Sequence, residues 1–493
     1  MELAFDWRAA RAALAQLPEL AAQESLQPPE LSGVYVPAHH AKALLLDSSV
    51  VVGMRGAGKS WWTAVLASPK HREFVSGQLQ GSGLSRVTAV VGFGLDETEQ
   101  DFPRAATLNA LLQDGVDPFE IWRSVVLRHA LKETDQPQPV NSDAWRDQVL
   151  WVTENGDEAN KRLTVCDAIL TERNRVLLVL FDAFDRLATD WDRVRKLSSA
   201  ALRLGLQLRS RRAIRLKFFI RPDLDEDPEI WSFPDSSKLL HAKVELAWNS
   251  ADLYGLVFMR LGNASGGGGF ASEFRRLTAR ELSIEWEERQ GVYLLPSRLA
   301  RDAELQREII EALADKYMGA GEKRGRTYTW VPLHLADAAG KTSPRSYLLA
   351  FKRAAEYTAQ YRPDHQRALH YSSIQEGVVK ASEIRVQEIA EDYPWVTPLL
   401  EAARGVVVPI TSEDLSVRWT SECLVKMRRA ARNKLPPRRF TSDPIRRGRP
   451  EALIDDLVEL AVLYRTKDGR LNIPDIFRVG FGIKRKGGVR PPR

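Results

Sequence analysis

The run Val51-Val52-Gly53-Met54-Arg55-Gly56-Ala57-Gly58-Lys59-Ser60 decides the fold of this chain. It reads G-x-x-x-x-G-K-S, it continues an apolar run that begins at Val50, and it precedes a helix predicted to start near Trp61. A loop of this pattern turns backbone N–H groups inward to cradle phosphate oxygens, and the following helix points its positive end at the same anion. The sequence therefore predicts a phosphate-binding P-loop between a buried strand and a helix.

Two side chains of this loop have predicted roles. Lys59 reaches the outer phosphates of a nucleotide, and the Ser60 hydroxyl is a ligand of Mg²⁺. The alternative is a glycine-rich turn that carries Lys-Ser by chance. The predicted nucleotide-binding residues are Gly53, Arg55, Gly56, Ala57, Gly58, Lys59, Ser60 and Trp61.

The composition is that of an ordinary globular chain. Its 493 residues are 44% hydrophobic and 28% charged, and this length predicts about two to four domains. No stretch approaches the roughly 20 apolar residues of a membrane span, and the acidic N-terminal residues predict no signal peptide. Cys166 and Cys423 offer neither metal-ligand spacing nor a disulfide framework, so a cytoplasmic location is the expectation.

Positive charge is concentrated near the C-terminus. The chain has a net charge of +6, yet residues 401–493 alone hold 21 Lys or Arg against 11 Asp or Glu. The preceding residues are therefore mildly acidic. This asymmetry indicates an anionic partner for the C-terminal segment, nucleic acid being the usual one, with a solvated basic surface as the alternative.

Three further apolar runs, 87–93, 176–181 and 214–220, predict buried strands. Continuous runs of β-branched and aliphatic residues are typical of strands covered on both faces, and the helical patterns between them predict a parallel α/β sheet. Ligands of such sheets bind at the carboxyl ends of the strands, where the P-loop also falls.

The first half of the chain is predicted to hold the nucleotide. Residues 1–46 form an N-terminal helical arm that packs on the next domain. Residues 47–240 form the P-loop nucleotide-binding domain, with an insertion at about 95–170 that lengthens the gap between its motifs.

The second half is predicted to be mainly helical. Strand signals fade after about residue 241, so 241–370 is predicted to form a helical lid subdomain. Residues 371–493 include a helix at 450–463 and a basic hairpin with an Asp-Gly turn at 464–473. Helix followed by basic hairpin is the outline of a winged-helix domain.

Two acids follow the apolar run 176–181. Asp182 stands where a carboxylate can hold Mg²⁺ through water, and Asp185 stands where it could orient or deprotonate an attacking water. The alternative for Asp182 is a turn former at the strand end. Ser60 and Asp182 together are the predicted metal site.

The apolar strand followed by Asp-Ala-Phe-Asp-Arg resembles the second nucleotide motif of STAND-type and KAP-type P-loop ATPases, within the AAA+/STAND assemblage. The resemblance covers roughly residues 48–360. It implies that Asp182 holds Mg²⁺ and that Asp185 helps hydrolysis. Arg186 matches the Asp-Arg ending of the KAP type, although KAP members often carry membrane spans and this sequence predicts none.

Two arginines resemble nucleotide sensors. Arg221, which closes the third run, is similar to the STAND arginine that contacts the outer phosphate. The alternative is a salt bridge to the nearby acids Asp223, Asp225 and Glu226. Arg345, in Ser-Pro-Arg-Ser at the start of a helix, resembles the sensor-2 region of AAA+ and origin-recognition-type ATPases, while Ser-Pro is also a common helix start.

Basic side chains gather in 426–449 and 484–493. Side chains of this kind neutralise phosphates without reading bases, so both stretches are predicted to contact double-stranded DNA. Prolines in the first stretch indicate a loop that either orders on DNA or stays solvated.

These features predict an ATP-binding and hydrolysing switch or motor of AAA+/STAND type that uses ATP and Mg²⁺. The resemblance implies coupling to a partner effector protein or to DNA, in DNA transactions or in bacterial antiviral defence; assembly into a homo-oligomer is left open. The alternative is a nucleic-acid-binding regulator with a structural, slowly hydrolysed nucleotide. A small-molecule kinase is disfavoured because no acceptor site is evident.

Overall fold

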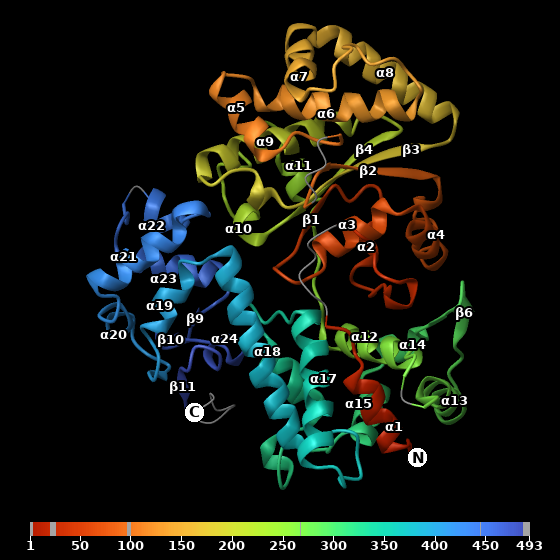
Figure 1. The fold of residues 1–493 in the computed structure, drawn as a ribbon, viewed down its shortest axis with the longest axis vertical. Coiled ribbons are helices and arrows are strands. Elements are labelled where there is room, and N and C mark those ends of the chain that lie inside the picture. Colours follow the sequence, from red (N-terminus) through yellow and green to blue (C-terminus); the bar gives the residue numbers. More distant parts are fainter. Residues whose placement is uncertain (1–2, 20–25, 96–99, 267, 444, 487–493) are drawn as a thin grey trace. The chain divides into compact units, whose positions relative to one another are not determined.

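A computed structural model describes residues 3–19, 26–95, 100–266, 268–443 and 445–486 (Figure 1). Parts of the predicted arm (1–2 and 20–25) and of the predicted insertion (96–99) lie outside these described residues. The chain forms two compact units. One comprises Ala22–Leu31 and Ala38–Ala247, and the other comprises Met1–Ala21, Ser32–Pro37 and Trp248–Arg493.

The first of these units, called here the sheet unit, is built on one parallel sheet of five strands in the order β2-β3-β4-β1-β5. The strands are β1 (Val50–Val52), β2 (Val87–Phe93), β3 (Val176–Phe181), β4 (Ile214–Ile220) and β5 (Val244–Glu245). The predicted α/β class with a parallel sheet is confirmed. Every residue of β1 and β3 is buried, which is why both strands read as unbroken apolar runs. The short β5 lies beyond residue 240, where the sequence gives no strand signal.

Helices cover both faces of this sheet (Figure 1). One face is covered by the helices between β2 and β3, which are α5 (Ala105–Gln113), α6 (Pro118–Glu133), α7 (Trp145–Glu154) and α8 (Gly156–Glu172), and by α9 (Trp191–Leu208), which follows β3. The other side carries α3 (Lys59–Ala67) and α4 (Pro69–Gln78). Trp122 of α6 is fully buried and its indole N–H donates to the Leu197 carbonyl at 2.9 Å, so α6 and α9 are joined by a polar contact inside the apolar layer.

A fully buried lysine ties β4 to the segment that leads into β1. Lys217 is 0% exposed, and its Nζ donates to the carbonyls of Ala43 at 2.7 Å, Leu45 at 2.9 Å and Ser48. These carbonyls belong to the end of the short helix α2 (Ala41–Leu44) and to the turn after it, and that of Leu45 also accepts the backbone N–H of Ser48 at 3.2 Å. Burial lowers the pKa of Lys217 to about 7, against the attraction of Asp47.

We expect Lys217→Met to destabilise the sheet unit by about 2 kcal/mol, because the carbonyls that Lys217 satisfies would stay buried. Urea unfolding followed by far-UV circular dichroism measures the change. Lys196→Met is the matched control, since Lys196 is 60% exposed and forms an ion pair with Asp192 on its own helix. An unchanged unfolding midpoint in Lys217→Met would contradict the role given to Lys217.

The other unit, called here the helical unit, begins with α1 (Trp7–Ala15). Phe5 stacks on Phe274 at 5.6 Å, and α1 packs on α13 (Phe270–Leu282) and α17 (Pro344–Tyr361). The prediction that the N-terminal arm packs on the domain following it in sequence is therefore wrong for this helix. Apolar periodicity predicts the helix but does not name its partner.

The region predicted as a helical lid contains α12 (Ser250–Gly262), α13, α14 (Ser297–Arg301), α15 (Ala303–Leu313), α16 (Thr327–Leu335) and α17. It also contains an antiparallel hairpin of β6 (Glu287–Arg289) and β7 (Val292–Leu294), which the sequence does not predict. The long helix α18 (Tyr371–Asp392) packs along α17.

The C-terminal part of this unit alternates short helices and strands. Its helices are α19 (Val396–Glu401), α20 (Ser412–Ser416), α21 (Ser421–Ala430), α22 (Arg438–Ser442), α23 (Pro450–Glu459) and α24 (Asp475–Arg478). The predicted hairpin is present as antiparallel β9 (Tyr464–Arg465) and β10 (Leu471–Asn472), and Ile410 bridges Leu471 on the other side. β8 (Val407–Val408) pairs with β11 (Lys484–Arg485). A winged-helix assignment stays a prediction.

Within the described residues, no helix combines the length and apolar character that crossing a membrane requires.

Candidate nucleotide-binding site

The glycine-rich loop joins β1 to α3, and its backbone requires glycine. Gly56 and Gly58 have φ of 78° and 104°. Residues with a Cβ adopt such positive φ values only at a cost in free energy. Gly58 is the N-cap of α3, so the helix begins at Lys59, two residues before the predicted start. A Cβ on Gly53 would lie 3.2 Å from Lys59 Cγ and 3.3 Å from Leu246 Cβ, so this position is closely packed.

The Lys59 side chain folds across the loop. Its Nζ donates to the carbonyl of Gly53 at 2.7 Å and to that of Met54 at 3.0 Å. The ammonium group thus lies beside the loop, at the end of α3 toward which the N–H groups of its first turn point. The remaining predicted binding residues, Arg55, Ala57 and Trp61, lie in this loop and in the first turn of α3.

Asp182 follows the last residue of β3 and is 1% exposed. Its backbone N–H donates to the Phe93 carbonyl at 2.9 Å, and its side chain hydrogen-bonds the Ser60 hydroxyl. Burial raises the pKa of Asp182, while the Ser60 hydroxyl and the nearby Lys59 ammonium oppose that rise. Asp182 Oδ2 is buried and has no hydrogen-bond partner among the described residues.

The donor set fits a hard divalent cation. Ser60 and Asp182 present a hydroxyl and a carboxylate side by side, and a buried carboxylate oxygen without a partner is stabilised by a cation. These two residues are the ones that would hold Mg²⁺.

Asp185 and Arg221 are brought together at the same edge of the sheet. Ala183 adopts φ 57° and turns the chain into a short 3₁₀ helix, Phe184–Arg186, that carries Asp185. Asp185 Oδ2 lies 3.1 Å from Arg221 Nη1, and Asp223 binds the same guanidinium through two contacts of 2.8 and 3.1 Å. The salt bridge that the sequence offers as the alternative for Arg221 is therefore present with Asp223.

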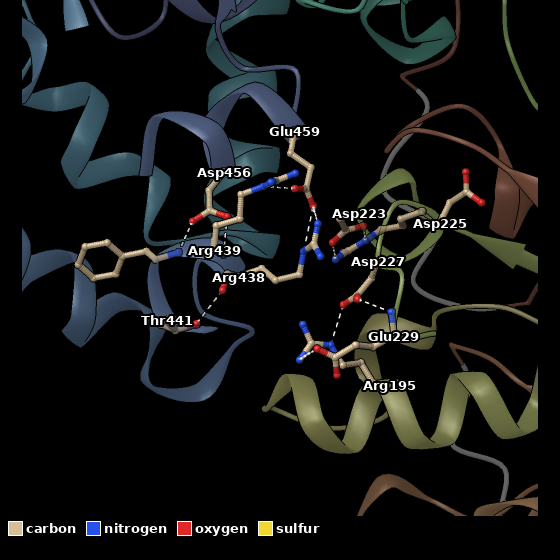
Figure 2. Close-up of polar contacts among 12 residues, drawn as sticks. Arg195, Asp223, Asp225, Asp227, Glu229, Arg438, Arg439, Thr441, Asp456 and Glu459 are labelled. Carbon is tan, nitrogen blue, oxygen red and sulfur yellow. Dashed lines mark hydrogen bonds and ion pairs between the residues drawn. The ribbon is translucent and has the colours of Figure 1, made fainter. Parts of the chain in front are cut away.

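The other acids after β4 also have basic partners. Asp225 pairs with Lys243 at 2.7 Å. Asp227 pairs with Arg195 of α9 at 2.7 Å (Figure 2). The Asp227–Arg195 contact fixes the acidic loop after β4 beside the first turns of α9.

Sequence reasoning missed His40, which holds α3 through a hydrogen bond with Trp62. Trp62 is buried and its indole N–H donates to His40 Nδ1 at 3.1 Å, while His40 Nε2 lies 3.0 Å from the Ala247 carbonyl. A ring that accepts at Nδ1 and donates at Nε2 is neutral, and burial lowers the pKa of His40 to about 3. Two adjacent histidines, His39 and His40, ahead of a strand carry no signal that could have revealed this contact.

We expect Trp62→Phe to destabilise the sheet unit by about 1–3 kcal/mol, because it removes the hydrogen bond to a buried ring nitrogen. Trp61→Phe is the matched control: Trp61 is half-buried and meets Trp62 edge-on at 4.5 Å. Urea unfolding monitored by circular dichroism compares the two. Equal losses in both variants would contradict the role of the Trp62–His40 bond.

Arg345 lies in the helical unit, in the first turn of α17. It pairs with Glu388 of α18, whose other oxygen accepts from Arg385 at 3.0 Å. Burial alone would raise the pKa of Glu388, but Arg385 and Arg345 outweigh it and lower that pKa. Arg345 and the P-loop residues belong to different units. The sensor role of Arg345 stays a prediction.

Several arginines of the basic stretch 426–449 are neutralised by acids of α23. Glu459 accepts from Arg438 at 2.7 Å and from Arg439 at 3.0 Å (Figure 2). Asp456 receives the backbone N–H groups of Arg439 and Phe440 at 2.8 and 3.0 Å.

The same compensation continues beyond these residues. Arg446 pairs with Asp443 at 3.1 Å and with Asp455, and Arg465 pairs with Asp455 at 2.9 Å. The basic side chains of the described part of this stretch that stand exposed are Lys426, which pairs with Glu422, and Arg428, Arg429, Arg432, Lys434, Arg447 and Arg449. Lys484, Arg485 and Lys486 are exposed too, whereas 487–493 lie outside the described residues.

Comparison with known proteins leaves the family open. No family model and no curated protein matches this sequence. Among solved structures, the ORC2 protein of Aeropyrum pernix, described as ADPNP-ADP complexes, aligns with 92% of this chain and 98% of its own at 14% identity and a TM-score of 0.30. CDC6P from Pyrobaculum aerophilum aligns with 94% of each chain at 12% identity and a TM-score of 0.31. A likeness at this level assigns no family.

Proposed function

We propose that the chain binds ATP with Mg²⁺ and hydrolyses it as a nucleotide-dependent switch or motor of AAA+/STAND type. The observation that carries this proposal is the buried Asp182 carboxylate, which hydrogen-bonds Ser60 of the glycine-rich loop and keeps one oxygen without a hydrogen-bond partner in the described part of the chain. Burying an ionised carboxylate costs free energy unless a cation neutralises its charge.

Each residue of the loop has a role that its position allows. The N–H groups of Gly58, Lys59 and Ser60 are proposed to bind the phosphates, and Lys59 Nζ to exchange the carbonyls of Gly53 and Met54 for phosphate oxygens. Ser60 and Asp182 hold the metal. When bound, Mg²⁺ supplies positive charge to the phosphate oxygens.

Asp185 is proposed to orient the attacking water, and Arg221 to stabilise charge on the outer phosphate. In this structure the two side chains form an ion pair of 3.1 Å with each other. Because Arg221 also binds Asp223, it must loosen from at least one carboxylate before it can turn to a phosphate. This favours slow basal turnover that a partner accelerates.

We propose that the partner is an effector protein or double-stranded DNA, that Arg345 reports nucleotide state from the lid segment 241–370, and that the work belongs to DNA transactions or antiviral defence. Assembly into a homo-oligomer belongs to the same proposal. These roles follow from the AAA+/STAND resemblance of the motifs.

We expect ATP hydrolysis by the purified chain to depend on Mg²⁺ and to fall at least about 100-fold in Lys59→Ala and in Asp182→Asn. Asp185→Ala should lower kcat about 10²–10⁴-fold with little change in nucleotide affinity, because Asp185 acts on the attacking water. Phosphate release measures turnover, and a fluorescent ATP analogue measures binding.

Asp192→Asn is the matched control, since Asp192 is 72% exposed on α9 and pairs with Lys196. Normal turnover in Asp182→Asn would overturn the proposed metal site. Tight nucleotide binding with no turnover in the unaltered chain would favour the second candidate, a nucleic-acid-binding regulator with a structural nucleotide. The Asp185–Arg221 ion pair is the observation that favours it.

DNA binding is tested on the exposed arginines only. We expect Arg428→Ala, Arg429→Ala and Arg432→Ala combined to weaken binding of a DNA duplex. The slope of log K against log salt should fall by about 0.9 for each phosphate that the variant no longer neutralises. Fluorescence anisotropy over a salt series measures both quantities.

The control changes Arg173, Arg209 and Arg212 to Ala, three exposed arginines of the sheet unit. If both triple variants lose affinity equally, the binding is non-specific attraction to a basic chain. If the unaltered chain binds no duplex, the basic side chains form a solvated surface and an effector protein is the remaining partner.

A further inference from the structure

Two histidines and an aspartate converge in the helical unit, in residues that the proposed nucleotide chemistry does not use. Asp315, His365 and His370 each offer a ligand atom, and these atoms all lie within 4.8 Å of one another. We propose that these residues bind one divalent transition-metal ion of the zinc class, with solvent completing the coordination. The site is independent of the function proposed for the P-loop.

The ligand atoms already have much of the required geometry. His365 Nε2 lies 3.1 Å from Asp315 Oδ1, and ligands of a tetrahedral zinc ion lie about 3.3 Å apart. The rings of His365 and His370 meet at 90° with centroids 4.9 Å apart. His370 therefore needs to move by at most about 1.5 Å to join the other two ligands.

One of the nitrogens is buried without a hydrogen bond. His365 Nε2 faces Asp315 but makes no hydrogen bond with any atom of the described residues. A buried ring nitrogen of this kind is costly, and a metal ion in place of a shared proton would satisfy both it and the carboxylate.

Neighbouring groups orient the other two ligands. Asp315 Oδ2 accepts the backbone N–H of Tyr371 at 2.9 Å, which leaves Oδ1 for the metal. His370 Nδ1 lies 2.7 Å from Ser372 Oγ, which leaves Nε2 as its metal-binding nitrogen. Contacts of this sort to the second nitrogen or oxygen are the usual support of metal ligands.

The backbone that carries the ligands is held from two sides. The segment after α15 pairs with the loop before α18: Asp315 N–H donates to the Leu369 carbonyl at 3.2 Å, and Leu369 N–H donates to that of Leu313 at 3.0 Å. The guanidinium of Arg11, from α1, donates to four carbonyls of the same loop at 2.7–3.0 Å; they belong to Pro363, His365, Arg367 and Ala368. The ligand loop is thus preorganised.

The chemistry of the donors selects the metal. Two imidazoles with one carboxylate suit Zn²⁺ and its neighbours in the first transition row, whereas Mg²⁺ and Ca²⁺ prefer oxygen alone. With three protein ligands the ion keeps at least one position for water. Binding would join the end of α15, the loop after α17 and the start of α18, and so stabilise the helical unit.

The test is calorimetric titration of the nucleotide-free chain of 493 residues with Zn²⁺ in excess Mg²⁺, which occupies oxygen-only sites. We expect one equivalent to bind and the thermal unfolding temperature to rise. Asp315→Asn and His370→Gln should each weaken binding at least 10-fold, since each removes a ligand. His241→Gln, an exposed histidine of the sheet unit, and Lys59→Ala should leave it unchanged. Absence of saturable binding, or equal affinity in the ligand variants, would overturn the site.

A second readout uses the unaltered chain, so that it does not depend on how the variants fold. Co²⁺ titration should give visible absorption bands that saturate at one equivalent and disappear when Zn²⁺ is added. A colourless titration would overturn the proposal and leave a histidine–aspartate ion pair in its place.

Discussion

A carboxylate buried at the carboxyl end of a parallel sheet is the constraint on which the sheet unit depends. Asp182 is 1% exposed and lies at the end of a strand with neighbours on both sides. An ionised acid in that position needs compensation, which comes from the Ser60 hydroxyl and the Lys59 ammonium group. The glycine-rich loop, the first turn of α3 and the end of β3 are therefore held together by one charge, and phosphate and metal chemistry at this edge depends on it.

The sequence predicts those elements of this architecture that need a particular pattern of neighbouring residues. β1 to β4 are predictable because strands buried on both faces must be apolar, and the P-loop is predictable because Gly56 and Gly58 adopt positive φ. The two-residue strand β5 and the β6–β7 hairpin are too short, or too polar in Glu287–Arg289, to leave such a pattern. Lys217 interrupts an apolar run, and only the carbonyls that it satisfies explain it.

Ion pairing is the feature that the sequence predicts least well, because composition gives the number of charged residues but not which of them pair. The basic stretch 426–449 looks like a phosphate-binding surface, yet Arg438 and Arg439 are neutralised by Glu459, which lies in α23 about 20 residues further on. The acids of α23 appear in the sequence as part of an amphipathic helix. Pairing between two short helices, α22 and α23, is set by packing, so the exposed set of arginines could be identified only in the folded chain.

The arginines with predicted sensor roles share one property: carboxylates in their own units already hold them. Arg221 lies between Asp185 and Asp223, and Arg345 shares Glu388 with Arg385. A nucleotide that recruits such an arginine replaces a carboxylate by a phosphate, so the net change in free energy is small and its sign depends on the number of phosphate charges. An exchange of nearly equal partners responds to removal of one phosphate, whereas an uncompensated arginine would bind every nucleotide tightly. The ion pairs that neutralise these arginines are thus what would make them sensitive to nucleotide state.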